Sequence, residues 1–531
     1  MSRDIYANYL NKSMSSNKQD IIQKPKNHSL NAPIKGKGNE INYGEDTVKI
    51  LREISSKLDK VNVERENYKS DESIELTQQS ESYVDLCIIN GKVVLPDNGI
   101  FKTDVYINNG KVHSLGKNDS LKARKTIDAT NKYVIPGVID PHVHLGLFAP
   151  LETELVTETK AALMGGITTM GCFFGSENSH FDTLPSILDN INEKSNVDIV
   201  PHLVISSQVQ RKEILDYINH LGVTSFKVYM NGIPNLIPDV DDGFILDVFE
   251  EIKKSSKECI VCSHSENRHL VRRAYNKVKE NKGDTANASD WAETHPDIVE
   301  EEAVMRLAFL AEKMDVDVYF VHISSGAAIN RLRKLKPFNK HINIETTSPY
   351  LSITKNSVKD NSIIMEPPFR EIEDVEQLWR AVDDEIVDTI GTDNVTMTKS
   401  EKNMDKSVWD TLPGYAVLET HLPNLLYEGV VKRGISLERI VSKITKKPAE
   451  IFNIYPQKGT LLPGSDGDAV IVDLDLTKKV ITSNLSTRSD FSIYDNKTIQ
   501  GWPITTIKSG EVVVQDGQYL DKSSKGKYIS R

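Results

Sequence analysis

The stretch DIVEEEAVMRLAFLAEKMDVDVYFVHIS, residues 297–324, joins a helix pattern to a strand pattern and carries a histidine near its end. Its first part is typical of a helix, and VDVYFVHIS is a run of apolar and β-branched residues typical of a buried strand. Such strands recur through the middle of the chain, with helical stretches between several of them. They are YVIPGVID (133–140), TTMGCFF (168–174), DIVPHLVIS (198–206), SFKVYM (225–230), CIVCSH (259–264), VDVYFVHIS (316–324), INIETT (342–347) and VDTIGTD (387–393). Eight strand–helix units predict an α/β fold, a (β/α)₈ TIM-type barrel.

The regions on either side of this middle are rich in short strands. Residues 83–116 alternate strand patterns with Asn-Gly and Asp-Asn-Gly turns, and a similar texture returns over 467–481 and 505–520. We expect these two ends to form a second, small β-sandwich domain. The predicted organisation is an N-terminal extension (1–81), the first part of the sandwich (82–135), the barrel (136–455), and the second part of the sandwich with a C-terminal tail (456–531).

The first 81 residues differ in composition from the rest of the chain. They are rich in Asn, Ser, Lys, Asp and Glu and poor in aromatic residues, which predicts a largely disordered extension. Within it, Val48, Leu51, Ile54 and Leu58 recur at helical spacing and predict one short amphipathic helix. Such a helix would dock either on the main body or on a neighbouring subunit.

Composition excludes several classes of protein. The formal net charge of −11, from 65 basic and 76 acidic residues, argues against a nucleic-acid partner. No run approaches the roughly 20 apolar residues of a membrane-spanning helix, so no membrane partner is expected. Four cysteines in 531 residues form no disulfide framework, and a reducing, cytoplasmic location is expected. Cys259 and Cys262 form a CxxC without a second pair, which favours buried thiols over a zinc or redox site.

Polar residues stand at the carboxyl ends of the predicted strands, where barrels of this type carry their active sites. They are His142 and His144 in the first strand, Lys227 in the fourth, His264 in the fifth, His322 in the sixth and Asp393 in the eighth. A single histidine of this kind is more often a core residue than a ligand, and Lys227 alone could extend its amine to solvent. Residues i and i+2 of a strand face the same side, so His142 and His144 can address one point. A His and Asp cluster at one barrel mouth predicts a metal site.

The order PGxIDxHxH, SFK, HxEN, VHxS and GTD resembles the amidohydrolase superfamily. Within it, the chain is most similar to the cyclic amidases, which are hydantoinase, dihydropyrimidinase, allantoinase and dihydroorotase. The segment FSIYDNKTIQGWPITTIKSGEVVVQDGQYL, residues 491–520, resembles the hydantoinase and dihydropyrimidinase tail in particular. The resemblance extends from about residue 82 to residue 531.

The resemblance implies a metal centre with a modified lysine. Lys227 would be N6-carboxylysine, a carbamate formed with carbon dioxide, and would bridge two divalent metal ions, with zinc expected. A lysine of pKa about 10.4 is a cation and cannot bind a metal, whereas a carbamate is an anion with two oxygens. His142, His144 and Asp393 would hold the more buried ion, and His264 and His322 the more exposed one. A hydroxide between the metals would attack, with Asp393 as general base and then acid.

Several positions depart from the family pattern. Gly146 stands where dihydroorotases carry a substrate-binding arginine, and Gly232 where hydantoinases carry a tyrosine that donates to the oxyanion. Glu366, in MEPPFR, replaces a small neutral residue; it either lines the pocket or lies on a shifted surface loop. Pro413 and Gly414 match a substrate-binding Asn-Gly, with the asparagine replaced. Asn394 follows Asp393 in place of the usual histidine. The metal ligands are thus kept while the substrate contacts differ.

The function implied is opening of a cyclic amide or imide ring by a metal-dependent hydrolase of hydantoinase or dihydropyrimidinase type. The resemblance also implies a homodimer or homotetramer. The alternatives are a ring-forming cyclase, an allantoinase-like or dihydroorotase-like enzyme, and a non-catalytic scaffold like the dihydropyrimidinase-related proteins. Because all six ligand positions are filled, the enzyme is favoured over the scaffold.

Overall fold

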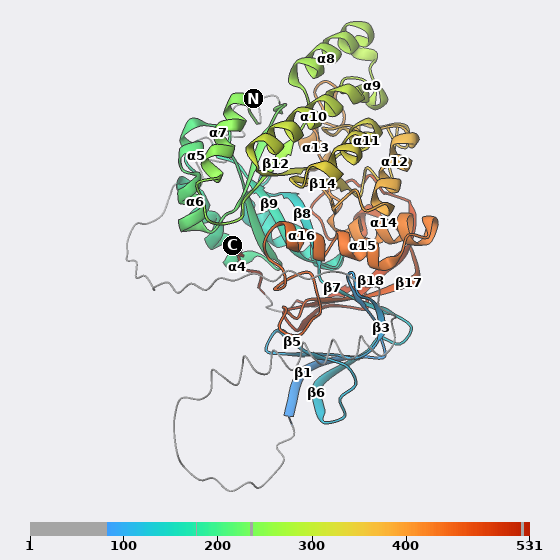
Figure 1. The fold of residues 1–531 in the computed structure, drawn as a ribbon. Helices are drawn as coiled ribbons and strands as arrows, with labels where there is room; N and C mark the ends of the chain where they lie inside the picture. Colours follow the sequence, from blue (N-terminus) through green and yellow to red (C-terminus); the bar gives the residue numbers. More distant parts are fainter. Residues whose placement is uncertain (1–81, 177, 234–236, 522–524) are drawn as a thin grey trace. The chain divides into compact units, whose positions relative to one another are not determined.

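The computed structural model describes residues 82–531 apart from 177, 234–236 and 522–524. The predicted extension and its amphipathic helix lie outside the described residues. Within the described part, parallel strands form a curved sheet flanked by helices, and two further sheets form a separate layer (Figure 1).

The parallel sheet supplies the strands of a TIM-type barrel. In sheet order they are β15 (Thr389–Gly391), β14 (Ile342–Thr347), β13 (Asp317–Phe320), β12 (Ile260–His264), β11 (Ser225–Tyr229), β10 (Asp198–Val204), β9 (Ile167–Phe174), β8 (Val138–His144) and β16 (Asn394–Val395). β15 pairs with β14, and β16 pairs with β8, both in parallel. The chain from β15 to β16 therefore closes the barrel, and Thr392 and Asp393 lie at the closure.

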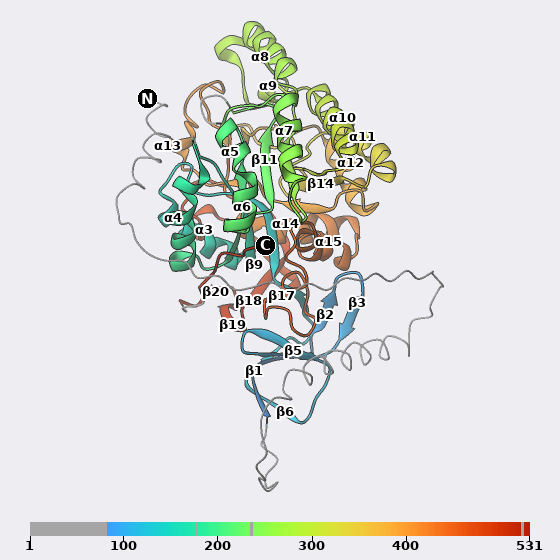
Figure 2. The ribbon, with the colours of Figure 1, turned by 60° about the vertical axis from the view of Figure 1, so that its left-hand side comes forward.

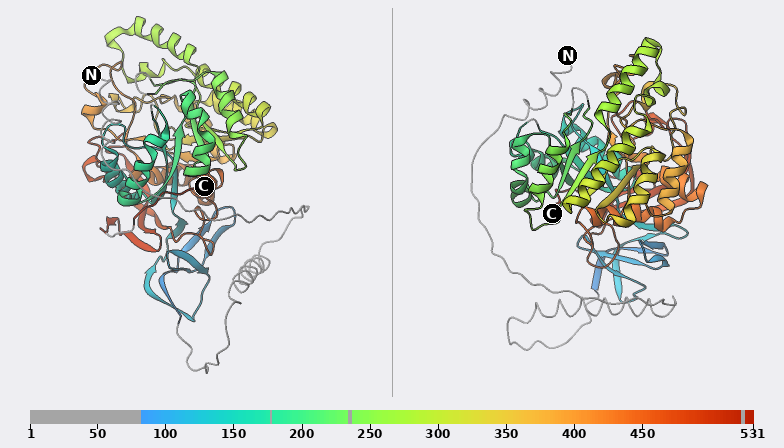
Figure 3. Two further views of the ribbon diagram at one scale, coloured as in Figure 1. Left: turned by 90° about the vertical axis from the view of Figure 1, so that its left-hand side faces the viewer. Right: turned by 45° about the horizontal axis from the view of Figure 1, so that its top comes forward.

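Helices cover the outside of this sheet (Figures 1 and 3). The longer ones are α3 (Leu151–Met164), α4 (Leu184–Lys194), α6 (Ile214–Leu221), α7 (Asp242–Ile252), α8 (Arg268–Lys282), α10 (Asp297–Met314), α11 (Gly326–Leu335) and α12 (Ile372–Asp383). Shorter ones are α5 (Gln208–Lys212), α9 (Ala288–Ala292), α13 (Lys399–Lys402), α14 (His421–Leu425), α15 (Leu437–Lys443) and α16 (Lys446–Ile451). The helix predicted over residues 297–314 is confirmed as α10.

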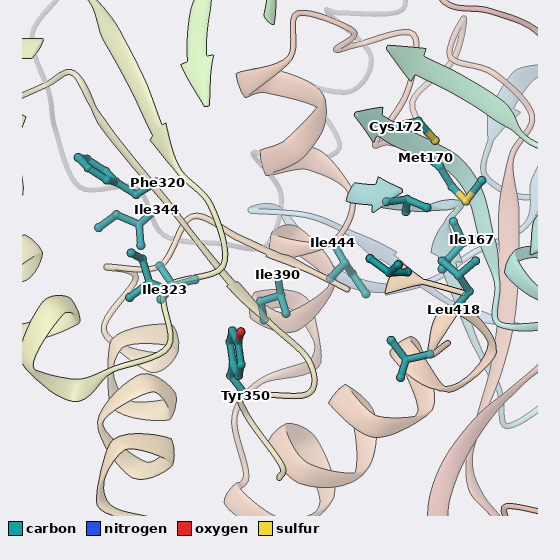
Figure 4. Close-up of a cluster of buried hydrophobic side chains, with 14 of the residues drawn as sticks. Ile167, Met170, Cys172, Phe320, Ile323, Ile344, Tyr350, Ile390, Leu418 and Ile444 are labelled. Atoms are coloured by element: carbon teal, nitrogen blue, oxygen red, sulfur yellow. The ribbon is translucent and has the colours of Figure 1, made fainter. Parts of the chain in front are cut away.

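The apolar faces of strands and helices meet in one large core. Figure 4 shows part of it, where Ile167 and Met170 of β9 lie near Leu418, and Phe320 and Ile344 come from neighbouring strands. Every residue of β8, β9 and β10 is buried. Continuous burial is expected of parallel strands that have side chains on one face and helices on the other.

The two ends of the described chain form the second layer together. One sheet has the order β5 (Lys111–Leu115), β4 (Val105–Asn108), β1 (Ser82–Ile89) and β6 (Leu121–Asp128). The other has the order β20 (Gln518–Tyr519), β19 (Glu511–Gln515), β18 (Thr498–Lys508), β17 (Ala469–Lys479), β7 (Tyr133–Pro136), β2 (Lys92–Leu95) and β3 (Gly99–Lys102). Their buried faces share one cluster, in which Ile88 and Ile107 pack with Ile471 and Ile507. The small sandwich predicted from both ends is thus present (Figure 2).

The single strand predicted over residues 133–140 is wrong, because the chain changes sheets there. β7 ends at Pro136 in the sandwich, and β8 begins at Val138 in the barrel. Gly137 lies between them in a crowded position, where a Cβ atom would come 2.2 Å from Thr168 Oγ1 and 2.8 Å from Asp468 Cβ. A sequence window sees one continuous apolar run, whereas the sheets are defined by partners far along the chain.

The sixth barrel strand also ends earlier than predicted. β13 stops at Phe320, and His322 follows it with a positive φ of 41°. All four cysteines are free thiols; Cys262 is buried in β12 as predicted, whereas Cys259 lies just before that strand and is only partly buried. Among the described residues, no helix is both long enough and apolar enough to cross a membrane.

Candidate metal centre

The side chains predicted at the strand ends converge at one mouth of the barrel. His144, Lys227, His264, His322 and Asp393 line a single cavity, and His142 lies fully buried behind Asp393. Each comes from a different strand or strand end, except the His142–His144 pair, whose i, i+2 spacing on β8 turns both rings the same way.

Three ligand-type atoms meet around Asp393. Its Oδ1 lies 3.2 Å from His142 Nε2 and 3.4 Å from His144 Nε2. Two atoms bound at about 2.0–2.1 Å to one tetrahedral ion are separated by about 3.4 Å. The spacing of this group therefore fits a metal ion, and the three residues form one cluster of potential ligands.

A second pair of nitrogens converges close by. His264 Nδ1 and His322 Nε2 lie 3.1 Å apart, and their rings meet edge to face. The rings of His142 and His322 stack with their centroids 5.4 Å apart, so the two groups are neighbours. The site thus contains a second pair of ligand-type nitrogens beside the cluster around Asp393.

Lys227 lies in the middle of β11 and is fully buried, which excludes the solvent-reaching lysine. Its Nζ has no hydrogen-bond partner and lies 4.7 Å from the Phe173 ring centroid and 5.0 Å from that of Tyr229. Burial lowers the pKa of Lys227 to about 8. About a tenth of the amine is then uncharged at pH 7, far more than for an ordinary lysine, and this is the form that can add carbon dioxide.

Burial disfavours the charged form of two imidazoles of this site. Burial lowers the pKa of both His142 and His322 well below the usual value. His142 Nε2 and His322 Nδ1 are buried without a hydrogen-bond partner. Neutral imidazoles with unpartnered nitrogens are suited to metal binding.

Glu345, inside β14, organises one half of the site, although it was not among the predicted site residues. Its Oε1 lies 2.8 Å from His142 Nδ1 and accepts the His322 backbone N–H at 2.8 Å, while its Oε2 accepts the Tyr319 hydroxyl at 2.7 Å. A carboxylate on Nδ1 fixes the tautomer that leaves Nε2 as a ligand. The signal was present in the sequence, because an acid inside the buried run INIETT is as unusual as the lysine in SFKVYM.

Glu266 has the same relation to the second half of the site. Its Oε2 lies 2.9 Å from His264 Nε2, which leaves His264 Nδ1 facing His322. Burial alone would raise the pKa of Glu266, but His295, His264 and Arg370 outweigh it and hold the pKa at about 2. Each predicted ligand group thus contains one histidine oriented by a buried carboxylate.

Asp393 is held in position by the barrel closure. Asp140 Oδ2 accepts the Thr392 hydroxyl at 2.6 Å, and the Asp393 N–H donates to His142 O at 2.9 Å. Asp393 has a positive φ of 54°, a strained conformation that is common at functional sites. Burial alone would raise its pKa, but His142, His144 and Lys227 outweigh it and bring the pKa to about 2. The aspartate is thus ionised and aimed at the histidines.

The predicted substrate contacts lie beside these groups. Glu366 is buried and lines the metal-site cavity, as does Pro413, so the surface-loop alternative for Glu366 is excluded. Gly414 is buried next to Val395, with a φ of 143° that favours glycine, and does not itself line the cavity. Tyr229 lines the cavity and stacks on His264 at 5.5 Å. Gly232, in the position of the family tyrosine, lines the adjoining cleft of about 1010 Å³.

The chain is similar to known proteins of one family. The model of the amidohydrolase family matches residues 133–513, which include all six predicted ligands. The chain belongs to the amidohydrolase family. Membership implies the use of divalent metal, which agrees with the cluster of ligand atoms around Asp393.

Two relatives and two solved structures illustrate the similarity. The L-hydantoinase of Paenarthrobacter aurescens is 29% identical over 463 residues, which cover 84% of this chain and 98% of that protein. The D-phenylhydantoinase of Escherichia coli (strain SE11) is 30% identical over 462 residues, 84% of this chain and 97% of the other. A D-hydantoinase structure has a TM-score of 0.78 at 27% identity and covers 84% of this chain and 99% of that one. The dihydropyrimidinase of Brevibacillus agri NCHU1002 has a TM-score of 0.78 at 26% identity, with 84% and 98% covered.

Proposed function

We propose that this amidohydrolase opens a cyclic amide or imide ring with the help of two divalent metal ions, zinc being the expected metal. The observation that carries the proposal is the convergence of six ligand-type side chains at one barrel mouth, with His142 Nε2 and Lys227 Nζ buried and without a hydrogen bond to any described residue. Hydantoinase relatives along 84% of the chain support the choice of a cyclic amide.

His142, His144 and Asp393 would hold one ion, and His264 and His322 the other. Lys227, once carboxylated, would bridge them, because its neutral amine can add carbon dioxide and the product is an anion. When bound, the metals supply a hydroxide nucleophile near neutral pH and polarise the scissile carbonyl.

The chain's own groups orient the reactants and move the proton. The Asp393 carboxylate accepts the proton of the attacking water and passes it to the ring nitrogen as the C–N bond breaks, so the ring opens to an amide or ureide and a carboxylate. Glu345 and Glu266 keep His142 and His264 in the tautomers that leave a nitrogen for the metals. Glu366 and Pro413, with Gly414 behind them, would shape the space for the ring.

The same groups could run the reaction in reverse, as a ring-forming cyclase, since proton transfer through Asp393 is symmetric. Gly146 leaves no arginine at the dihydroorotase position, which disfavours that activity. A scaffold role is disfavoured because every ligand position is filled. We also propose that the protein forms a homodimer or homotetramer, as its resemblance to the cyclic amidases implies.

Metal content and ring opening test this proposal together. Protein expressed with added zinc should contain two metal ions per chain by elemental analysis. A panel of cyclic ureides, imides and lactams should show ring opening as a loss of ultraviolet absorbance, abolished by a chelator and restored by zinc. Fewer than one metal per chain, with no member of the panel opened, would refute it.

A further inference from the structure

A group of buried polar atoms beside the candidate metal centre has no hydrogen-bond partner among the described residues. Glu366 Oε2, Glu266 Oε1 and His295 Nε2 are all buried and without a hydrogen bond. Glu366 and His295 line the same cleft of about 1010 Å³, which reaches His144 and Tyr229 at its inner end. Glu266 lies behind His295, with its Oε2 3.9 Å from His295 Nε2.

The unpartnered nitrogen of His295 is a hydrogen-bond acceptor. The Thr294 hydroxyl donates to Trp291 O at 2.7 Å, so it accepts from His295 Nδ1, also at 2.7 Å. Burial lowers the pKa of His295 to about 4, which keeps the ring neutral. With its one proton on Nδ1, Nε2 can only accept.

Glu366 lacks a counter-charge among the described residues, and once ionised it is an acceptor of the same kind. Glu266 has His264 Nε2 at 2.9 Å from its Oε2, and its Oε1 has no hydrogen bond to any described residue. Among residues 82–531 as described, no Lys, Arg or His lies within 4.0 Å of the Glu366 carboxylate in an ion pair. Burial, and then Glu266, raise the pKa of Glu366 to about 8, so its charged form near neutral pH needs a counter-charge that the described residues do not supply. A positively charged ligand would supply that counter-charge and hold Glu366 as a carboxylate.

From these cleft-lining groups we infer that Glu366 and His295, with the Glu266 carboxyl close to His295, form a subsite for a positively charged, N–H-rich group of the substrate, such as an ammonium or guanidinium. The inference rests on the proposed function, because it names the class of ring substituent that the same cleft takes. The indole of Trp291 lines this part of the cleft and is fixed by its own hydrogen bond to Met365 O at 3.0 Å. An aromatic face beside the carboxylates adds a cation–π contact.

The outer part of the cleft has no comparable site for a positively charged group. At its outer part Arg268 pairs with Asp239, so these charges cancel. Asp410 and Arg272 are exposed to solvent, where their charges are screened. The cleft is much larger than a bare five- or six-membered ring and has the size of clefts that hold drug-sized ligands. It therefore has room for a substituent that reaches Glu366.

Two ring substrates with arms of equal length test the inference on the full, zinc-loaded enzyme. They are 5-(3-aminopropyl)hydantoin, whose arm ends in an ammonium, and 5-butylhydantoin, whose arm ends in a methyl. We expect kcat/KM for the ammonium substrate to exceed that for the methyl substrate by about tenfold or more, as charged hydrogen bonds typically give. A ratio near one in the wild-type enzyme would overturn the inference.

Matched variants show which residue causes the preference for the ammonium substrate. Glu366→Gln keeps the shape but not the charge and should reduce the ratio to near one, and Glu366→Ser should do the same if the glutamine variant folds poorly. Asp410→Asn removes a carboxylate from the outer part of the same cleft and should leave the ratio as in the wild type. An unchanged ratio in both Glu366 variants, or an equal fall in Asp410→Asn, contradicts the assignment.

The test separates this inference from the proposed function. If 5-butylhydantoin is opened and the ammonium gives no advantage, the subsite is wrong and the hydrolase stands. If neither ring is opened, the proposed function is in doubt, and calorimetry on Asp393→Asn still tests the subsite. That variant should bind 5-(3-aminopropyl)hydantoin about tenfold more tightly than the double variant Asp393→Asn with Glu366→Gln, and equal affinities would overturn the inference.

Discussion

At the scale of single residues, the buried environment of Lys227 determines which chemical form its amine can take. An amine buried in the middle of a strand, with aromatic rings at 4.7 and 5.0 Å and no hydrogen-bond partner, is unstable as a plain cation. Burial lowers its pKa to about 8, which permits the neutral form. Carboxylation turns it into an anion that the neighbouring histidines and metals can stabilise.

Lys227 variants test this interpretation. Lys227→Met keeps the volume of the side chain but cannot be carboxylated, and Lys227→Arg stays a cation. Both should lose the second metal by elemental analysis and lose nearly all activity. Adding a short carboxylate such as propionate, with zinc, to Lys227→Ala should restore part of the rate. An arginine variant with near-normal turnover and two metals would exclude the carbamate.

At the scale of elements, the junction of β7 and β8 passes the chain from the sandwich to the barrel. Gly137 is the only residue between these two strands, and its missing side chain lets Thr168 and Asp468 approach. The backbone contacts agree, because Gly137 N–H donates to Asp468 O at 2.8 Å. Close approach of two domains at this point requires glycine.

Gly137→Ala should therefore destabilise the protein. Its Cβ would meet Thr168 Oγ1 at 2.2 Å, and overpacking of this kind costs about 1–3 kcal/mol. The midpoint of thermal unfolding, followed by circular dichroism, should fall. Gly243→Ala is the control, because Gly243 lies in the first turn of α7 with only Asp241 Oδ1 nearby, at 3.3 Å, and there alanine should be neutral or stabilising. Equal effects of both substitutions would argue against crowding at the junction.

At the scale of the whole described chain, a buried ionic cluster joins barrel and sandwich. Lys458 Nζ contacts Asp466 at 2.8 Å and Asp468 at 2.6 Å and also pairs with Asp198 of β10, while Lys508 of β18 lies 2.8 Å from Asp198. Burial would lower the pKa of Lys458, but Asp468, Asp198 and Asp466 outweigh it and raise the pKa. The three aspartates are close enough to hold an ion, but the lysine ammonium occupies their centre, so the cluster is structural.

Removing one acid from this cluster should weaken the whole molecule. Asp198→Asn leaves two buried lysines short of a counter-charge, and breaking such a group costs about 3–5 kcal/mol. The free energy of unfolding in urea should fall accordingly. Asp473→Asn, which breaks the half-buried pair with Lys132, should cost less than about 1 kcal/mol. Similar losses in both variants would show that the buried cluster has no special role.

The sequence by itself determined the strand–helix order, the small sandwich made from both ends, and the ligand-type residues at the strand ends. These follow from local periodicity and from motifs whose spacing is short, such as His142 and His144 two residues apart. Glu366 was identified as unusual, but its burial in the pocket was left open.

Only the tertiary structure decided which residues meet. Glu345 contacts His142 across 203 positions, and Lys458 contacts Asp198 across 260. The change of sheet at Gly137 and the convergence of Glu366, His295 and Glu266 depend on partners equally far along the chain. A local pattern encodes the period of one element, whereas contacts between elements are set when the barrel closes and burial makes hydrogen bonds between distant polar groups favourable.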